Sequence, residues 1–318
     1  MAAAYTADNL LEEIRRAGSL PSTAATGTAD ADLLAHADAE LRDTLVPLIL
    51  GVHEEFYQRV FDVTVVAGAP PAYRLNKRAA MSRINTVQWI NSDGTGFNLP
   101  RYEPKRVAEM SLIVAAVGQP TGYYLEGSRV VLYPTPNGAG TLRIRAQVRP
   151  GRLALLAATG SIVSTAVTGT AATSFVITIN PHAYTTATPV DVVAATPSFE
   201  YLALDAIPSA VSTTVSITLA GSAFSSDPAV GDYVCSPDTS PFVQLPVELH
   251  PALVELTTAR VLRALGKLKE AENHSQEAGR LVGTGIQALT PRVDTAARKI
   301  VGGPHFRRKG MGLLRGGT

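Results

Sequence analysis

The sequence has only one cysteine, Cys235, and one tryptophan, Trp89, among its 318 residues. A single cysteine cannot form an internal disulfide, and with only six scattered histidines it does not suggest a cysteine-based zinc or iron–sulfur site. No apolar run reaches the roughly 18 residues that a membrane-spanning helix needs. Acidic residues follow Met1 too closely for a secretory signal peptide. The sequence therefore predicts a soluble, unexported protein with no cofactor and no membrane partner.

Charge is balanced in total but segregated along the chain. Residues 1–70 hold four basic and eleven acidic side chains, whereas residues 71–152 hold twelve basic and four acidic ones. Six acidic residues and no basic residue occur in 153–245, and 292–318 holds seven basic residues against one aspartate. We expect surfaces of opposite sign that suit docking of partners or of further copies. Chance clustering of surface charges is the alternative.

Helical periodicity marks both ends of the chain. Leu10, Leu11 and Ile14 form one apolar face that ends at Gly18, so a helix is expected at 7–17. A second helix is expected from 30 onward, with Pro47 as a kink or an end. Two further helices are expected at 246–265 and 267–289. The second helix would bury one row of side chains: Leu33, Leu34, Ala37, Leu41, Leu45 and Leu48.

Between the first two and the last two helices, the apolar residues recur with a period of two, which is typical of β-strands. Strands are expected at 60–66 and 84–90, and a further helix at 105–117. A β-hairpin is expected from 128–133 and 141–149, with Asn137-Gly138 at its bend. On its second arm Leu142, Ile144, Ala146 and Val148 would be buried, while Arg143, Arg145 and Gln147 would face water.

The composition changes again from 155 to about 241, where Thr, Ala, Val and Ser dominate. Short β-branched runs at 161–167, 175–179, 190–193, 213–219 and 232–235 predict an antiparallel β-sandwich or barrel. The predicted fold class is α+β, with helices from both chain ends forming a bundle. The expected domains are 1–152 with 246–291 as helical core and β-hairpins, 153–245 as an inserted β domain, and 292–318 as an extended basic arm.

The sequence shows no arrangement that points to catalysis. The histidines lie far apart, and neither Gly94-x-Gly96 nor Gly138-x-Gly140 continues into a phosphate-binding motif. Cys235 lies in an apolar β run without a basic neighbour, which predicts an unreactive buried thiol. We therefore expect a protein that is not an enzyme.

Two basic features stand out. The first is the tail, whose glycine-rich sequence favours an arm that orders on a partner or contacts phosphates. Its candidate docking residues are Arg292, Arg298, Lys299, Phe306, Arg307, Arg308, Lys309 and Arg315. The second is a candidate interface or channel face made of Arg129, Arg143, Arg145 and Arg149, for which a solvated sheet face is an equal explanation.

Several segments together resemble a known family. They include Gly18-Ser19-Leu20-Pro21, Asp30-Ala31-Asp32-Leu33-Leu34, Tyr123-Tyr124-Leu125-Glu126-Gly127, Val131-Leu132-Tyr133-Pro134-Thr135-Pro136, Thr141-Leu142-Arg143-Ile144-Arg145, Arg149-Pro150-Gly151, Gln244-Leu245-Pro246-Val247-Glu248-Leu249-His250-Pro251 and Thr290-Pro291-Arg292-Val293-Asp294. In this layout the chain resembles the head-to-tail adaptor (connector) proteins of tailed bacteriophages. The resemblance covers most of the chain outside 153–245.

The resemblance implies a structural virion protein at the capsid–tail junction, assembled in the host cytoplasm. Such adaptors form a ring, commonly of twelve copies, that binds the portal protein, extends the DNA channel and docks tail or neck proteins. It implies a bundle from the helices at 7–17, 30–58, 246–265 and 267–289, and an arm at 292–318 that docks on the portal. Non-specific contact with packaged DNA is a further expectation.

Two alternatives stay open. One is a distal neck, tail-completion or tail-tube protein, which would meet the tail and not the portal. The other is a carbohydrate-binding module or hydrolase that uses the β insertion. Its six carboxylates show no recognised ligand spacing: Asp191, Glu200, Asp205, Asp227, Asp232 and Asp238.

Overall fold

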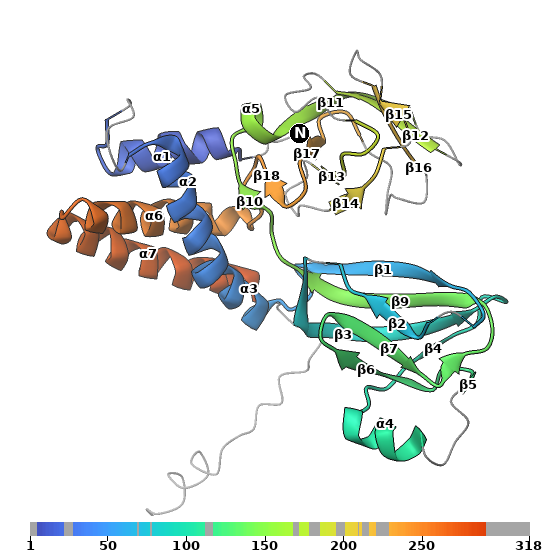
Figure 1. Cartoon of the computed structure of the whole chain (residues 1–318). Coiled ribbons are helices and arrows are strands. Elements are labelled where there is room, and N and C mark those ends of the chain that lie inside the picture. Colours follow the sequence, from blue (N-terminus) through green and yellow to red (C-terminus); the bar gives the residue numbers. More distant parts are fainter. Residues whose placement is uncertain are drawn as a thin grey trace, which may run out of the picture.

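The computed structural model shows an α+β protein with the helices of both chain ends on one side and several antiparallel sheets on the other (Figure 1). The residues described are 5–21, 28–68, 70–76, 78–111, 117–167, 172–177, 185–194, 201–208, 210–211, 216–220 and 229–290. The arm expected at 292–318 lies outside them. No helix in this part of the chain has the length and hydropathy of a membrane span.

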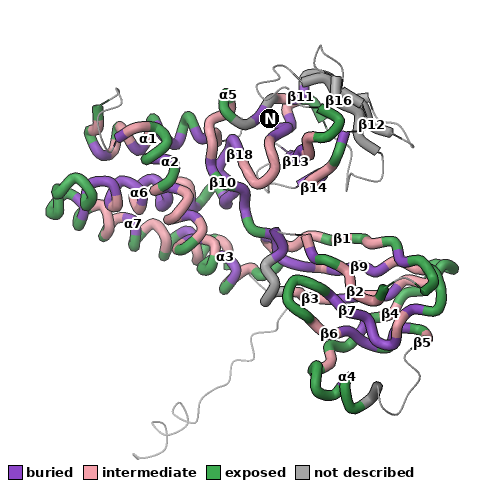
Figure 2. Tube along the Cα trace, in the orientation of Figure 1, coloured by how far each residue is buried: buried purple, intermediate pink, exposed green. Residues whose placement is uncertain are grey.

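Helices from both chain ends pack around one hydrophobic core. They are α1 (Ala7–Ala17), α2 (Asp30–Ala39), α6 (His250–Ala264), which follows a 3-10 turn at Val247–Leu249, and α7 (Leu268–Leu289). Their apolar faces meet, so Leu10, Ile14, Leu33, Leu253 and Leu262 are fully buried (Figure 2). The helices expected at 7–17, 246–265 and 267–289 are confirmed.

The second helix is continuous but changes its winding. After α2 the chain forms a π-helical segment, Glu40–Leu45, and continues as α3 (Val46–Val52), with Pro47 in its first turn. Because a π turn takes more residues than an α turn, the buried row shifts. Ile49 is fully buried, and Leu48, which we expected on the buried face, is 41% exposed.

Residues 58–148 form two facing sheets that we call the two-sheet unit. One sheet has the order β1 (Gln58–Val65), β9 (Gly140–Val148), β3 (Ala79–Asn91), β4 (Gly96–Asn98). The other has the order β2 (Ala72–Arg74), β7 (Arg129–Tyr133), β6 (Gly122–Glu126). Both sheets bury side chains in a second core, separate from that of the helices, around Trp89, Val130, Leu132, Leu142 and Ile144. The strands expected at 60–66 and 84–90 are therefore present.

The hairpin expected from 128–133 and 141–149 is wrong. β7 pairs with β2 and β6, whereas β9 pairs with β1 and β3 in the other sheet. Residues 134–139 therefore connect the two sheets, and within them β8 (Thr135–Pro136) pairs with β5 (Val117–Gly118). Alternating burial arises equally when two strands pair and when they face each other across a core, so the pattern alone could not separate these cases.

Two smaller expectations also need correction. The helix expected at 105–117 is α4 (Pro104–Ser111), and Val117 lies in β5; 112–116 lie outside the described residues. Leu142, Ile144, Ala146 and Val148 are buried as expected. Gln147, expected to face water, is buried instead, and its Nε2 donates a hydrogen bond to the carbonyl of Glu54 at 2.7 Å.

The insertion is an antiparallel β domain, as expected. Its described strands pair in the order β14 (Tyr201–Ala206), β13 (Val190–Val193), β17 (Tyr233–Cys235), β11 (Gly160–Val167), β12 (Ala172–Ile177), β16 (Ser216–Ala220), β15 (Ala210–Val211). These pairings leave the sheet open, so the closed barrel that we considered is not formed by the described strands. β14 and β15 were not expected, whereas each of the five predicted β-branched runs contributes to a strand.

The insertion begins and ends at one place. β10 (Arg152–Leu153), which precedes the short helix α5 (Leu156–Thr159), pairs in parallel with β18 (Thr239–Ser240). Val193, Tyr201, Tyr233 and Cys235 belong to the same core as the helices. Apolar packing therefore fixes the insertion to the helices.

Candidate functional site

A buried arginine joins the two-sheet unit to the insertion. Arg78, just before β3, has 2% of its surface exposed. Its Nη2 lies 2.9 Å from Oδ2 of Asp191, its Nε lies 3.0 Å from Oδ1 of Asp238, and its guanidinium lies 5.0 Å from the ring centre of Tyr201. Both carboxylates belong to the insertion, so one cation from the basic part of the chain is neutralised by the acidic part.

Asp191 organises the surface of the insertion around Arg78. It is fully buried, and its two oxygens accept hydrogen bonds from the backbone N–H of Asp205 at 2.7 Å and of Asp238 at 3.1 Å. Asp205 and Asp238 both have positive φ, a conformation that aspartate tolerates better than most residues. Burial raises the pKa of the Asp191 carboxyl, although Arg78 and the two N–H groups act in the opposite direction.

Further polar contacts surround this pair. Arg59 of β1 donates hydrogen bonds to the carbonyls of Tyr201 and, at 3.2 Å, Leu202. The hydroxyl of Tyr201 donates to Oε1 of Gln244 at 2.9 Å, and that same oxygen accepts the backbone N–H of Gly151 at 2.6 Å. We call the group formed by Arg59, Arg78, Asp191, Tyr201 and Asp238 the arginine junction. It connects the two-sheet unit, the insertion and the segment that leads to α6.

Cys235 lies beside the arginine junction and is fully buried. Burial, the largest cause, and Asp191 both raise the pKa of its thiol. Arg78, a basic neighbour that the sequence did not reveal, acts in the opposite direction, but the net pKa is raised and the thiol stays protonated at neutral pH. This environment agrees with the unreactive thiol expected from the sequence.

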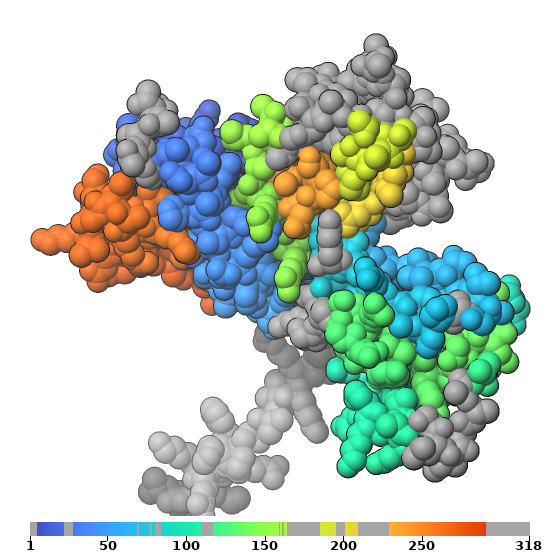
Figure 3. Space-filling view, viewed as in Figure 1, coloured from blue at the N-terminus to red at the C-terminus, as the bar shows by residue number. Residues whose placement is uncertain are grey.

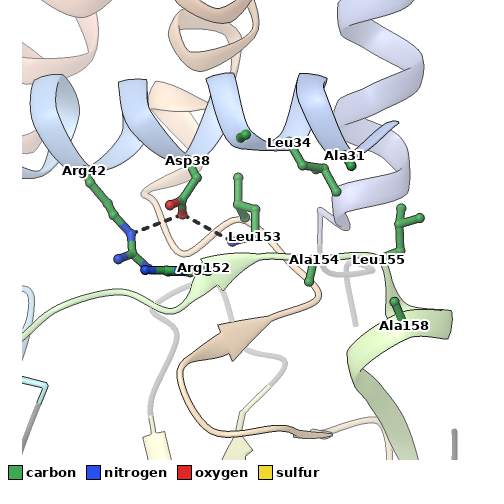
Figure 4. A pocket seen from close by; sticks show the side chains of 10 residues that line it. Ala31, Leu34, Asp38, Arg42, Arg152, Leu153, Ala154, Leu155 and Ala158 are labelled. Atoms are coloured by element: carbon green, nitrogen blue, oxygen red, sulfur yellow. Dashed lines mark hydrogen bonds and ion pairs between the residues drawn. The ribbon is translucent and has the colours of Figure 1, made fainter. Parts of the chain in front are cut away.

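A groove of about 470 Å³ lies between α2 and the segment from β10 to α5 (Figure 4). Its wall is mostly apolar and includes Leu34, Leu153 and Leu155. Oδ1 of Asp38 accepts hydrogen bonds from Nε of Arg42 at 3.1 Å and from the backbone N–H of Leu153 at 3.3 Å. Burial raises the pKa of Asp38 despite Arg42. The bond from Leu153 holds α2 against β10, so Asp38 has a structural role in the groove.

The structure does not bring the four arginines of the predicted basic face together. Arg143 and Arg145 lie on the outer face of the sheet that contains β9, where Arg143 makes two 2.8 Å bonds to Asp62. Arg149 follows β9 and is exposed. Arg129 lies in β7, across the second core, so including it with the other three was wrong. The arm residues expected to dock on the portal lie outside the described residues.

The carboxylates of the insertion do not form a metal centre among the described residues, where no group of three or more His, Cys, Asp or Glu side chains is placed to hold an ion. Asp191 and Asp238 bind Arg78, and Asp232 accepts the backbone N–H of Ala229 at 2.7 Å. Glu200 and Asp227 lie outside the described residues.

Sequence reasoning missed the arginine junction. The available signal was the insertion itself, which carries six acidic residues and no basic one. Because a buried carboxylate needs a cationic or hydrogen-bonding partner, any carboxylate buried there required a cation from another segment. Which arginine supplies it depends on tertiary contacts that the sequence pattern does not reveal.

Comparison with known proteins gives no family assignment: no protein-family model matches the chain, and no curated protein sequence matches it.

Proposed function

We propose that this protein is a non-enzymatic structural component of a tailed-phage virion. It is a head-to-tail adaptor that forms a ring beneath the portal, joins the capsid to the tail and extends the DNA channel. The observation that supports this proposal most is the packing of α1 and α2 against α6 and α7 around one core. These are the segments that the resemblance to phage adaptors assigns to a helical bundle.

Charge segregation supports assembly into a ring. Exposed acidic residues of the N-terminal helices and exposed basic residues of the two-sheet unit lie in different parts of the molecule (Figure 1). Contact between unlike surfaces of neighbouring copies is heterologous and closes into a ring when the rotation permits. A ring then presents many arms at once, so individually weak arms bind the portal strongly.

The insertion supplies a second docking surface in this proposal. As a small β-sandwich on the helical bundle, it faces outward and binds tail proteins, fibres or capsid. The arginine junction holds it in one orientation relative to the two-sheet unit, which a docking surface on a symmetric ring requires.

Deleting 292–318 tests the portal-docking role of the arm. We expect the shortened protein to lose attachment to purified portal rings, because the deletion removes seven basic side chains. We expect its helix content to stay the same, because the core lies within the described residues. Co-sedimentation with portal measures attachment, and far-UV circular dichroism measures folding.

A matched variant separates charge from chain length. It keeps the full tail but carries glutamine at the seven basic positions: Arg292, Arg298, Lys299, Arg307, Arg308, Lys309 and Arg315. Electrostatic docking predicts that this variant also fails to attach. Unchanged attachment of a folded protein without 292–318 would refute the docking role of the arm.

A further inference from the structure

Two arginines of like charge lie directly opposite each other on the outer face of the smaller sheet. Arg74 of β2 pairs in register with Arg129 of β7, and both side chains are exposed. Neither side chain forms a hydrogen bond or ion pair with another described residue. Glu126 lies directly opposite Arg129 on β6 and is also exposed, but no ion pair joins the two side chains. Like charges directly opposite on neighbouring strands destabilise a sheet. No described carboxylate forms an ion pair with either arginine, so this basic pair can gain stability from an anionic partner outside its own unit.

The N-terminal helix carries the opposite arrangement. Asp8 and Glu12 of α1 are four residues apart, so they share one helix face, and both are exposed. Like charges at this spacing destabilise a helix. The helix dipole accounts for Asp8, in the first turn, but not for Glu12 one turn later. Arg16, four residues beyond Glu12, forms no ion pair with it among the described residues.

The two pairs cannot satisfy each other within one molecule. The helices lie at one end of the space-filling view and the two-sheet unit at the other (Figure 3). α1 lies among the helices, and β2 and β7 lie in the two-sheet unit (Figure 1). Two complementary patches far apart on one chain are suited to a head-to-tail contact between copies.

We propose that the Arg74–Arg129 pair of one copy docks on the Asp8–Glu12 pair of the next copy. This inference rests on the proposed ring and names its subunit contact. Exposed ion pairs are individually weak and screened by salt, so two free copies associate weakly and best at low ionic strength. The same contact repeated around a ring gains from high effective concentration. The free chain therefore stays largely monomeric until the portal brings several copies together.

Charge reversal with complementation tests this contact. One variant carries Arg74→Glu and Arg129→Glu, which makes both patches acidic. The other carries Asp8→Lys and Glu12→Lys, which makes both patches basic. We expect each variant alone to associate at least about tenfold more weakly than the wild type at low salt, because like charges then meet at the contact. An equimolar mixture regains association, since each acidic patch meets a basic one.

Sedimentation velocity over a concentration series measures the association. A matched control carries Arg101→Glu and Arg106→Glu, which make the same change in net charge at two other exposed arginines of the two-sheet unit. The control associates as the wild type does. The contact is wrong if the wild type stays monomeric at low salt, if reversal leaves association unchanged, or if the mixture fails to associate.

Two further readouts separate this contact from other roles. Loss of duplex DNA binding in the Arg74→Glu, Arg129→Glu variant, with association intact, would assign the basic pair to nucleic acid and refute the copy–copy contact. Portal binding is measured separately. If copies associate through these pairs but do not bind the portal, the proposed adaptor function is refuted. If copies bind the portal and charge reversal does not change their association, only this contact is refuted.

Discussion

Replacing Arg78 with methionine is expected to lower the free energy of unfolding by about 3–5 kcal/mol, because it leaves a buried carboxylate without its cation. Asp191 is fully buried, and among the described residues only Arg78 forms an ion pair with it, at 2.9 Å. The substitution also removes the 3.0 Å bond to Asp238 and the cation–π contact with Tyr201. Urea unfolding followed by far-UV circular dichroism measures the loss.

A surface ion pair of the same unit provides the matched control. Arg143 makes two bonds to Asp62 at similar distances, but 36% of the Arg143 side chain and 43% of the Asp62 side chain are exposed. Arg143→Met should therefore cost no more than about 1 kcal/mol. Equal losses for Arg78→Met and Arg143→Met would contradict the account of the arginine junction.

The effect of Arg78→Met should depend on pH in a defined direction. Burial already raises the pKa of Asp191, and loss of Arg78 removes an interaction that lowers it. In the folded variant Asp191 then binds a proton more tightly than it does in the unfolded chain. The loss in free energy of unfolding relative to the wild type therefore becomes smaller as pH falls through the raised pKa toward the ordinary value of 3.8. Adding Asp191→Asn removes the charge and should make the deficit smaller and independent of pH in this range.

Replacing Gly140 with valine is expected to destabilise the two-sheet unit by about 1–3 kcal/mol, because it overpacks the second core. A Cβ atom at this position would lie 2.5 Å from Cζ2 of Trp89 and 2.7 Å from the carbonyl oxygen of Ile90. Both distances are shorter than side-chain carbons normally allow, so Trp89 or the start of β9 must move.

The chain supplies its own control and its own reporter for this prediction. Gly138 lies two residues earlier, and a Cβ there would meet nothing within 4 Å, so Gly138→Val should have little effect. Trp89 is the only tryptophan, so its fluorescence follows the two-sheet unit. We expect Gly140→Val to shift the fluorescence transition to lower urea and the helical transition less, because the two cores are separate. Unchanged fluorescence midpoints for Gly140→Val would contradict this packing.

The helices could be predicted because local signals specify them. The apolar spacing of Leu10, Leu11 and Ile14 and the stop at Gly18 place α1 correctly. Leu48 shows the limit of this reasoning. The π-helical segment changes which side chain is buried, and the spacing of apolar residues in the sequence does not reveal a π-helical segment.

Strand positions were also predictable, but strand partners were not. The apolar run in β7 and the alternation in β9 located both strands, yet these strands lie in different sheets that share one core. Pairing depends on contacts between segments distant in sequence, and alternation is the same in either case. For this reason Arg129 was wrongly grouped with Arg143, Arg145 and Arg149.

The arginine junction depends on tertiary structure to an even greater degree. It brings Arg78 together with Asp191 and Asp238, which lie more than a hundred residues later in the chain. In the sequence, only the charge imbalance between 71–152 and 153–245 indicated that such ion pairs exist.

The mass of the purified protein, measured alone and with portal rings by native mass spectrometry, tests the proposed adaptor function most directly. The account predicts a free protein of low mass at physiological salt and a complex in which a fixed number of copies, matching the symmetry of the portal, is added to each ring. A folded protein that adds no mass to the portal at any concentration would contradict the account and favour a distal tail component.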